Sequence, residues 1–195
     1  MLDYKILSLI RDFAFNNSEK DDIHGFSHVE RVYNLCLKLG KFLRADLRIL
    51  QIASLLHDIG RIHEIDINKK NHAELSAEIA LEFLQSKGFS ISYEEQNNII
   101  HCIRSHSFSN NSNPQTLEAK ILSDADKLDA LGAIGLYRTI GFTIKKKGGL
   151  DQVIEHLENK ILNLKDQLYL DISKEMAKER ESIIRDFYKE ILKQK

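Results

Sequence analysis

Apolar residues recur every three or four positions along most of the chain, which is the spacing of one face of an α-helix. No stretch alternates between apolar and polar residues for long enough to predict a β-strand. The pattern therefore predicts an all-α fold, a single-domain helical bundle of about eight or nine helices. Seven helices are predicted at residues 3–15, 71–87, 92–105, 117–129, 130–145, 150–170 and 173–193. Two more lie between the first and second of these, one with an apolar face from Val29 to Phe42 and one that ends at His57.

Polar residues mark where helices begin and end. Ser27 followed by Glu30 has the pattern of a capping box, and Asp46 is expected to cap the helix that ends at His57. Residues 61–71 are polar and are expected to form the rim of a site. Residues 107–116 give the strongest loop signal, and both a lid over a binding site and a plain surface connection are open interpretations.

Composition fits a soluble globular protein with long helices. Of 195 residues, 43% are hydrophobic and 29% are charged, with a single proline to interrupt helices. A net charge of −1 gives no basic field for nucleic acid. The two cysteines, Cys36 and Cys102, are expected to be reduced and buried. Because neither a signal-peptide pattern nor an apolar run of membrane-spanning length occurs, we expect a cytoplasmic protein that does not enter the membrane.

The chain is organised around His57 and Asp58, which end the apolar run 49–56 and precede Gly60. An imidazole nitrogen and a carboxylate oxygen together suit a divalent transition metal. A His-Asp pair is common by itself. It gains weight here from His28 upstream and Asp126 downstream.

The stretches around these residues resemble the HD-domain phosphohydrolase superfamily, and within it a branch of small bacterial hydrolases, some of which act on nucleotides. The matching stretches are residues 28–32 (His-Val-Glu-Arg-Val), 56–61 (Leu-His-Asp-Ile-Gly-Arg) and 122–133 (Leu-Ser-Asp-Ala-Asp-Lys-Leu-Asp-Ala-Leu-Gly-Ala). The resemblance covers roughly residues 22–141. It implies one HD domain over 1–195, with helices at about 150–193 packed on the motif core or building a homodimer.

The same resemblance implies a metal ion held by four ligands from separate helices, which are His28, His57, Asp58 and Asp126. An octahedral ion with four protein ligands keeps two positions for water and substrate. Such an ion lowers the pKa of a bound water and draws charge from a phosphoryl oxygen. We expect Mn²⁺ first, with Mg²⁺, Co²⁺, Ni²⁺, Fe²⁺ and Zn²⁺ as alternatives.

Further histidines in the matching region form a second tier of candidates, namely His24, His72, His101 and His106. His72 and His106 are expected to line the phosphate pocket or orient the attacking water, although some HD proteins use histidines in this order for a second metal ion. Plain structural roles for both are a third interpretation. His24 would share a helix face with His28 if that helix extended so far back.

A polyanionic substrate requires positive charge near the metal. Arg61 directly follows the His-Asp turn and is the first choice for a phosphate contact, with Lys127, next to Asp126, as the second. Arg104 and Arg138 are better interpreted as solvated or ion-paired charges at the surface. Asp129 lies one helical turn after Asp126 and is expected to orient a ligand or pair with a base.

These features predict a metal-dependent phosphohydrolase with Asp58, Arg61, His72, His106 and Lys127 in catalytic roles. Its substrate would be a small phosphorylated molecule, a nucleotide in the first instance, and a nucleoside triphosphate pyrophosphohydrolase is the favoured form. Alternatives are a phosphomonoesterase, a cyclic-nucleotide phosphodiesterase and a protein that binds a nucleotide without turnover. An oxygenase with a di-iron centre is a further alternative, and it would require a second metal ion.

Overall fold

All regular structure that the computed structural model describes is helical, which confirms the predicted all-α class. The structure describes residues 2–63, 71–107 and 112–195. The chain divides into two compact units, residues 1–125 and 126–195, and each is described by itself. None of the helices within the described ranges is both long and apolar enough to cross a membrane.

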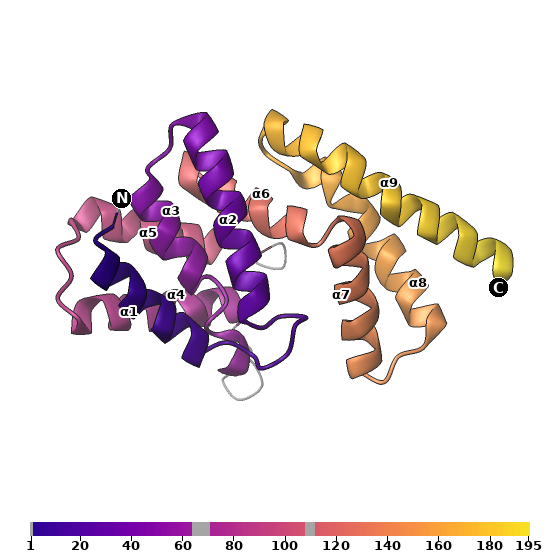
Figure 1. The fold of residues 1–195 in the computed structure, drawn as a ribbon, viewed down its shortest axis with the longest axis horizontal. Coiled ribbons are helices and arrows are strands. Elements are labelled where there is room, and N and C mark those ends of the chain that lie inside the picture. Colours follow the sequence, from indigo (N-terminus) through magenta and orange to yellow (C-terminus); the bar gives the residue numbers. More distant parts are fainter. Residues whose placement is uncertain (1, 64–70, 108–111) are drawn as a thin grey trace. The chain divides into compact units, whose positions relative to one another are not determined.

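The first unit is built around α3 (Leu47–Leu56), which is labelled in Figure 1. Its residues from Ile49 to Leu56 are all buried. A short helix that is apolar on nearly every side can bury itself only by packing against several others. Its neighbours in this unit include α1, α2, α4 and α5. The helices of the unit are α1 (Tyr4–Asn16), α2 (Phe26–Leu43), α3, the 3₁₀ turn η1 (Arg61–His63), α4 (His72–Ser86), α5 (Tyr93–Ser105) and α6 (Leu117–Asp129), the last of which continues into the second unit.

The two ends of α3 have different functions. Asp46 caps its start as predicted, because its carboxylate accepts the backbone N–H groups of Arg48 and Ile49 at 2.8 and 3.3 Å. His57 is the C-cap residue at the other end. The helix therefore delivers the His-Asp pair to the interior of the unit.

Gly60 holds the His-Asp turn against α4. Its N–H donates to the Ser76 hydroxyl at 2.9 Å. A Cβ atom at this position would lie 2.5 Å from the backbone nitrogen of Ser76 and 2.7 Å from the carbonyl oxygen of His72. The close approach of α4, which carries His72, thus requires glycine here.

The start of α2 corrects the prediction of a Ser27 cap. The N-cap is Gly25, which has no side chain to bond the first turn, and the helix begins at Phe26. The preceding loop folds onto Asp21, whose carboxylate accepts the N–H groups of Ile23 and His24. His24 therefore lies before the helix and does not share its face with His28.

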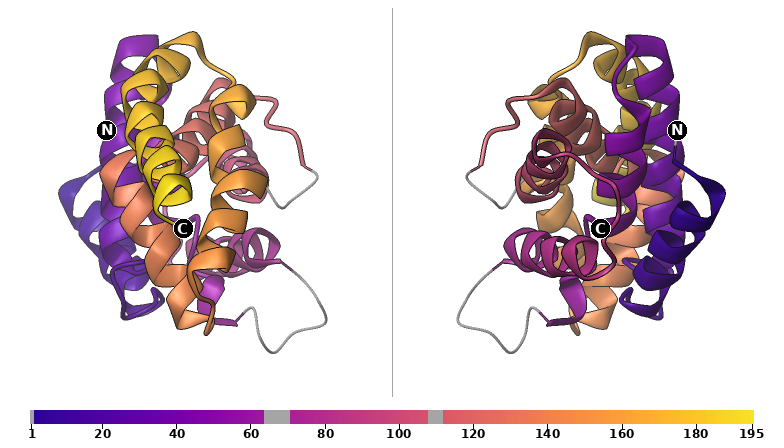
Figure 2. Two further views of the ribbon diagram at one scale, coloured as in Figure 1. Left: turned by 90° about the vertical axis from the view of Figure 1, so that its right-hand side faces the viewer. Right: turned by 90° about the vertical axis from the view of Figure 1, so that its left-hand side faces the viewer.

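The second unit consists of α7 (Gly132–Lys145), α8 (Leu150–Asn159), the 3₁₀ turns η2 (Ile161–Asn163) and η3 (Lys165–Gln167), and α9 (Asp171–Gln194), together with the end of α6. Figure 2 shows α8 in orange and α9 in yellow, and α7 packs against both. The predicted helix 150–170 is wrong in its second half, because α8 ends at Asn159 and the two turns follow.

The two predicted loops are described only in part. Residues 61–63 of the polar stretch 61–71 form η1, and residues 64–70 lie outside the described residues. Residues 108–111 of the second loop also lie outside them. Its last residues are tied to α5, because the Gln115 N–H donates to His101 Nε2 at 2.9 Å and the Thr116 hydroxyl donates to Asn98 at 2.7 Å. The rim and the lid stay predictions.

Candidate metal centre

The ring of His57 is oriented by the helix that carries it. His57 is fully buried, and its Nδ1 atom lies 2.8 Å from the carbonyl oxygen of Ser54, three residues earlier. A carbonyl accepts only, so Nδ1 carries the hydrogen, and in the neutral ring Nε2 keeps its lone pair. This lone pair is the one that a metal ion can use.

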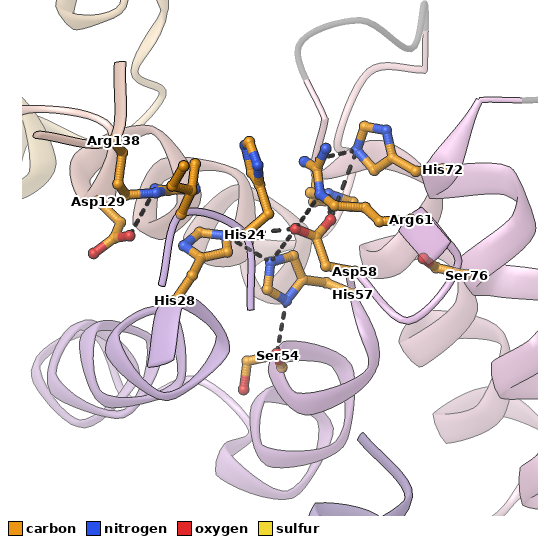
Figure 3. A network of polar contacts seen from close by, with 12 residues as sticks. His24, His28, Ser54, His57, Asp58, Arg61, His72, Ser76, Asp129 and Arg138 are labelled. Carbon is orange, nitrogen blue, oxygen red and sulfur yellow. Dashed lines mark hydrogen bonds and ion pairs between the residues drawn. The ribbon is translucent and has the colours of Figure 1, made fainter. Parts of the chain in front are cut away.

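The first buried group joins His28 on α2 to His57 and Asp58 (Figure 3). The Nε2 atoms of the two histidines lie 3.4 Å apart. Asp58 Oδ2 lies 3.5 Å from Nε2 of His28 and 3.6 Å from Nε2 of His57. Three ligand atoms, one from α2 and two from the turn that follows α3, thus converge on one point in the interior.

The second group uses the other oxygen of the same carboxylate. Asp58 Oδ1 lies 3.4 Å from Nε2 of His106 and 3.7 Å from Nε2 of His72. His106 is the C-cap residue of α5, and its Nδ1 atom lies 2.6 Å from the carbonyl oxygen of Ile103. The His106 ring is therefore oriented in the same way as that of His57, with its Nε2 lone pair facing Asp58.

Among the residues that the structure describes, two atoms of this second group have no hydrogen-bond partner. They are Asp58 Oδ1 and His106 Nε2, and both are buried. Buried polar atoms without partners are uncommon in proteins, and those that occur often mark a place for an ion or a water molecule. The arrangement therefore favours a bound ligand next to these two atoms.

Arg61 supplies positive charge to the cluster. Its Nε atom donates to Asp58 Oδ2 at 2.5 Å, and its Nη2 atom lies 3.3 Å from His72 Nε2. Burial alone would raise the pKa of Asp58, but the Arg61 guanidinium holds that pKa well below its usual range. Asp58 is therefore a carboxylate and can act as a metal ligand at neutral pH.

The chemistry of these side chains fits a divalent transition metal. Within the described ranges, the groups of histidine, cysteine and acidic residues able to hold an ion are His28–His57–Asp58 and Asp58–His72–His106. Neutral imidazole and carboxylate are ligands of Mn²⁺, Fe²⁺, Co²⁺, Ni²⁺ and Zn²⁺. Either group would leave coordination positions for water and substrate.

Six of the predicted site residues come together in the first unit, namely His28, His57, Asp58, Arg61, His72 and His106. Asp126 and Lys127 belong to the second unit, and their roles stay predictions. Lys127 is buried there, with Nζ 5.2 Å from the centre of the Tyr169 ring.

Two other predicted charges form ion pairs. Arg138 donates to Asp129 at 2.7 Å inside the second unit, and Arg104 donates to Glu74 at 2.9 Å at the surface of the first. Arg104 is thus confirmed as an ion-paired surface charge. Arg138 is also ion-paired, but the expectation of a surface charge is wrong, because Arg138 and its partner Asp129 are both buried.

The roles of the Ser54 and Ile103 carbonyl groups, which orient two of the rings, were not predicted from the sequence. The available signal was the position of each histidine directly after an apolar helix, because the last carbonyls of a helix lack intrahelical partners.

A family model for the HD domain matches residues 25–131, which is more than half of the chain. The chain belongs to the HD domain family. Its relatives include the uncharacterized protein YpgQ of Bacillus subtilis, which is 32% identical over 178 residues that cover 87% of this chain and 83% of YpgQ.

Solved HD structures match nearly the whole chain. The crystal structure of B. subtilis YpgQ in complex with ADP superposes with a TM-score of 0.78 at 28% identity, covering 98% of this chain and 95% of that one. A predicted HD superfamily hydrolase from an uncultured Thermotogales bacterium gives a TM-score of 0.66 at 30% identity, covering 97% and 91%. This HD protein thus has the fold of HD superfamily hydrolases.

Proposed function

We propose that this protein is a divalent-metal-dependent phosphohydrolase that acts on a nucleotide. The observation that carries the proposal is the position of Asp58, which turns one oxygen toward each of two buried histidine groups. Two of those histidines, His57 and His106, have Nε2 lone pairs fixed by hydrogen bonds at Nδ1. A hydrolytic metal centre requires such a set of oriented nitrogen and oxygen ligands with open positions beside it.

His28, His57 and Asp58 would hold the ion, with Asp126 as the fourth ligand that the HD resemblance implies. We favour Mn²⁺ over the other divalent ions. When bound, such an ion acidifies a coordinated water and withdraws charge from a phosphoryl oxygen.

The protein's own residues would bind the phosphate, orient the attacking water and accept its proton. Arg61 and Lys127 would bind the phosphate oxygens, whose negative charge rises in the transition state. The His106 Nε2 lone pair would orient the attacking water and accept its proton, with His72 beside it. Asp58, with its lowered pKa, would stay ionised throughout.

A nucleotide is the substrate we favour because the related YpgQ was crystallised with ADP. The reaction we propose is cleavage of a nucleoside triphosphate into the monophosphate and pyrophosphate, which fits the resemblance to the small bacterial HD branch. A cytoplasmic location belongs to the same proposal, since nucleotides are made and used there. A homodimer built through the C-terminal helices also stays a proposal, and light scattering would test it.

The test is a panel of nucleotides incubated with Mn²⁺-loaded protein, with pyrophosphate and orthophosphate measured separately. Pyrophosphate release from triphosphates, abolished in Asp58→Ala and retained in the surface control Asp151→Ala, is the expected result. Orthophosphate released only from monophosphates would indicate a phosphomonoesterase. Opening of cyclic nucleotides would indicate a phosphodiesterase, and nucleotide binding without any product would overturn the hydrolase.

A further inference from the structure

Arg61 connects the two halves of the histidine cluster. In Figure 3 its side chain lies between the Asp58 carboxylate and the His72 ring, with contacts of 2.5 Å from Nε to Asp58 Oδ2 and 3.3 Å from Nη2 to His72 Nε2. A guanidinium has no acceptor and stays protonated in proteins. His72 Nε2 must therefore be the acceptor, and its lone pair is directed at Arg61.

That lone pair is also the one that His72 would offer to an ion in the group Asp58–His72–His106. A nitrogen lone pair cannot serve a guanidinium N–H and a metal ion at once. While Arg61 engages His72, the group retains two ligand atoms, Asp58 Oδ1 and His106 Nε2. Two protein ligands are fewer than the three or four that hold hydrolytic metals in proteins.

The first group is affected less. Arg61 meets it at Asp58 Oδ2, and a carboxylate has about four lone-pair sites on its two oxygens. The Nε2 atoms of His28 and His57 still converge on that oxygen at 3.5 and 3.6 Å. Arg61 therefore competes with a cation chiefly in the second group, where it takes the only lone pair that His72 could offer to an ion.

We infer that Arg61 restricts this cluster to one divalent ion, bound at His28–His57–Asp58, and takes the place of a second cation beside His72 and His106. The inference rests on the proposed metal site. In this inference, Arg61 determines whether the cluster binds one metal ion or two. The two unpartnered atoms, Asp58 Oδ1 and His106 Nε2, then face a water molecule.

The experiment counts ions and does not depend on turnover. Full-length protein is loaded with Mn²⁺ and gel-filtered, the bound metal is measured by mass spectrometry, and the spin coupling of two close ions is sought by electron paramagnetic resonance. Wild type should bind one uncoupled ion per chain. Arg61→Met should bind two coupled ions, whereas Arg61→Lys, which keeps the charge, should bind one. Arg104→Met is the matched control, since Arg104 pairs with Glu74 and should leave the count at one.

A second variant keeps the test valid if Arg61→Met does not fold. His106→Ala in the wild-type background should leave the count at one, because the second group is not expected to hold an ion. Two ions in wild type, falling to one in His106→Ala, would overturn the inference and leave the proposed hydrolase intact. A single ion in folded Arg61→Met would also overturn it. Absence of bound metal in wild type would overturn the proposed metal site itself, together with the inference.

Discussion

His106 Nε2 and Asp58 Oδ1 face each other at 3.4 Å in the protein interior, and neither has a hydrogen-bond partner within residues 2–63, 71–107 and 112–195. With Nδ1 of His106 donating to the Ile103 carbonyl, the neutral ring and the carboxylate both present lone pairs to this space. Two acceptors do not stabilise each other. A donor such as water satisfies both, and it would then lie next to a base that can take its proton.

His106→Ala removes that base. We expect turnover to fall by roughly 10²–10⁴-fold, the usual contribution of a general base, while the affinity for Mn²⁺ changes little. Steady-state kinetics and Mn²⁺ titration measure the two effects. His101→Ala on the same helix is the control and should keep near wild-type turnover, because His101 bonds the Gln115 backbone. A loss of Mn²⁺ affinity as large as the loss of turnover would instead make His106 a metal ligand.

Gly60→Ala should destabilise the first unit. The added Cβ would meet the backbone of Ser76 and His72 at 2.5 and 2.7 Å, so α4 must shift away from the His-Asp turn. Overpacking of this kind lowers the free energy of unfolding by about 1–3 kcal/mol, which urea unfolding measures. Gly149→Ala, whose Cβ would meet only Gln152 Oε1 at 3.7 Å, should cost less than about 1 kcal/mol. Equal losses in both variants would contradict the role given to Gly60.

Arg138→Met should destabilise the second unit, because it removes the guanidinium that is ion-paired with the buried Asp129 carboxylate. The two side chains are only 9% and 4% exposed, and breaking such a pair costs roughly 3–5 kcal/mol. Thermal or urea unfolding gives the value, and adding Asp129→Asn should recover part of it. Arg104→Met breaks a pair whose side chains are 43% and 33% exposed, so it should cost about 1 kcal/mol or less. A similar cost for the two arginines would contradict this distinction.

His156 should make the stability of the second unit depend on pH. Burial against α7, where its ring packs on Phe142 and its Nδ1 lies 3.5 Å from the Thr143 hydroxyl, lowers the pKa of His156, and Lys160 and Lys146 lower it further. A lowered pKa means that the folded state prefers the neutral ring. The contribution to stability is then complete above the unfolded pKa of about 6.5 and is lost as the pH falls through the folded pKa.

His156→Gln should therefore flatten the fall in unfolding free energy between neutral and mildly acidic pH, as measured by urea unfolding at several pH values. Titration of the ring by NMR gives the pKa directly, and Lys146→Gln should move it upward. An unchanged pH profile in His156→Gln would assign the acid sensitivity to other groups.

The local elements of the fold were predictable because their signals lie within one helix. The apolar run 49–56 and the Asp46 cap place α3 and the His-Asp pair without any tertiary information. The start of α2 was missed because Ser27 has the right chemistry for a cap, whereas Gly25 is selected by a tight approach to the Asp21 carbonyl. Close backbone contacts of that kind leave no periodic pattern in a sequence.

The residue types of the site were also predictable. That each oxygen of the Asp58 carboxylate faces a different pair of histidines was not. Which oxygen faces which histidine depends on how α2, α4 and α5 pack around the end of α3. Likewise, the expectation that Arg61 binds phosphate was based only on its position in the sequence, directly after the His-Asp turn. Its contact with His72, eleven residues further along the chain, required the three-dimensional structure.

Each of the two histidines that follow a helix is tied to a carbonyl three residues back in its own chain segment. Because this hydrogen bond lies within one segment, the segment selects the imidazole tautomer without a contact from another helix. Neighbouring helices can then diverge in sequence without disturbing the proton arrangement of the ring. A helix that ends in a histidine of this kind is therefore a suitable element for placing an oriented metal ligand in a designed protein.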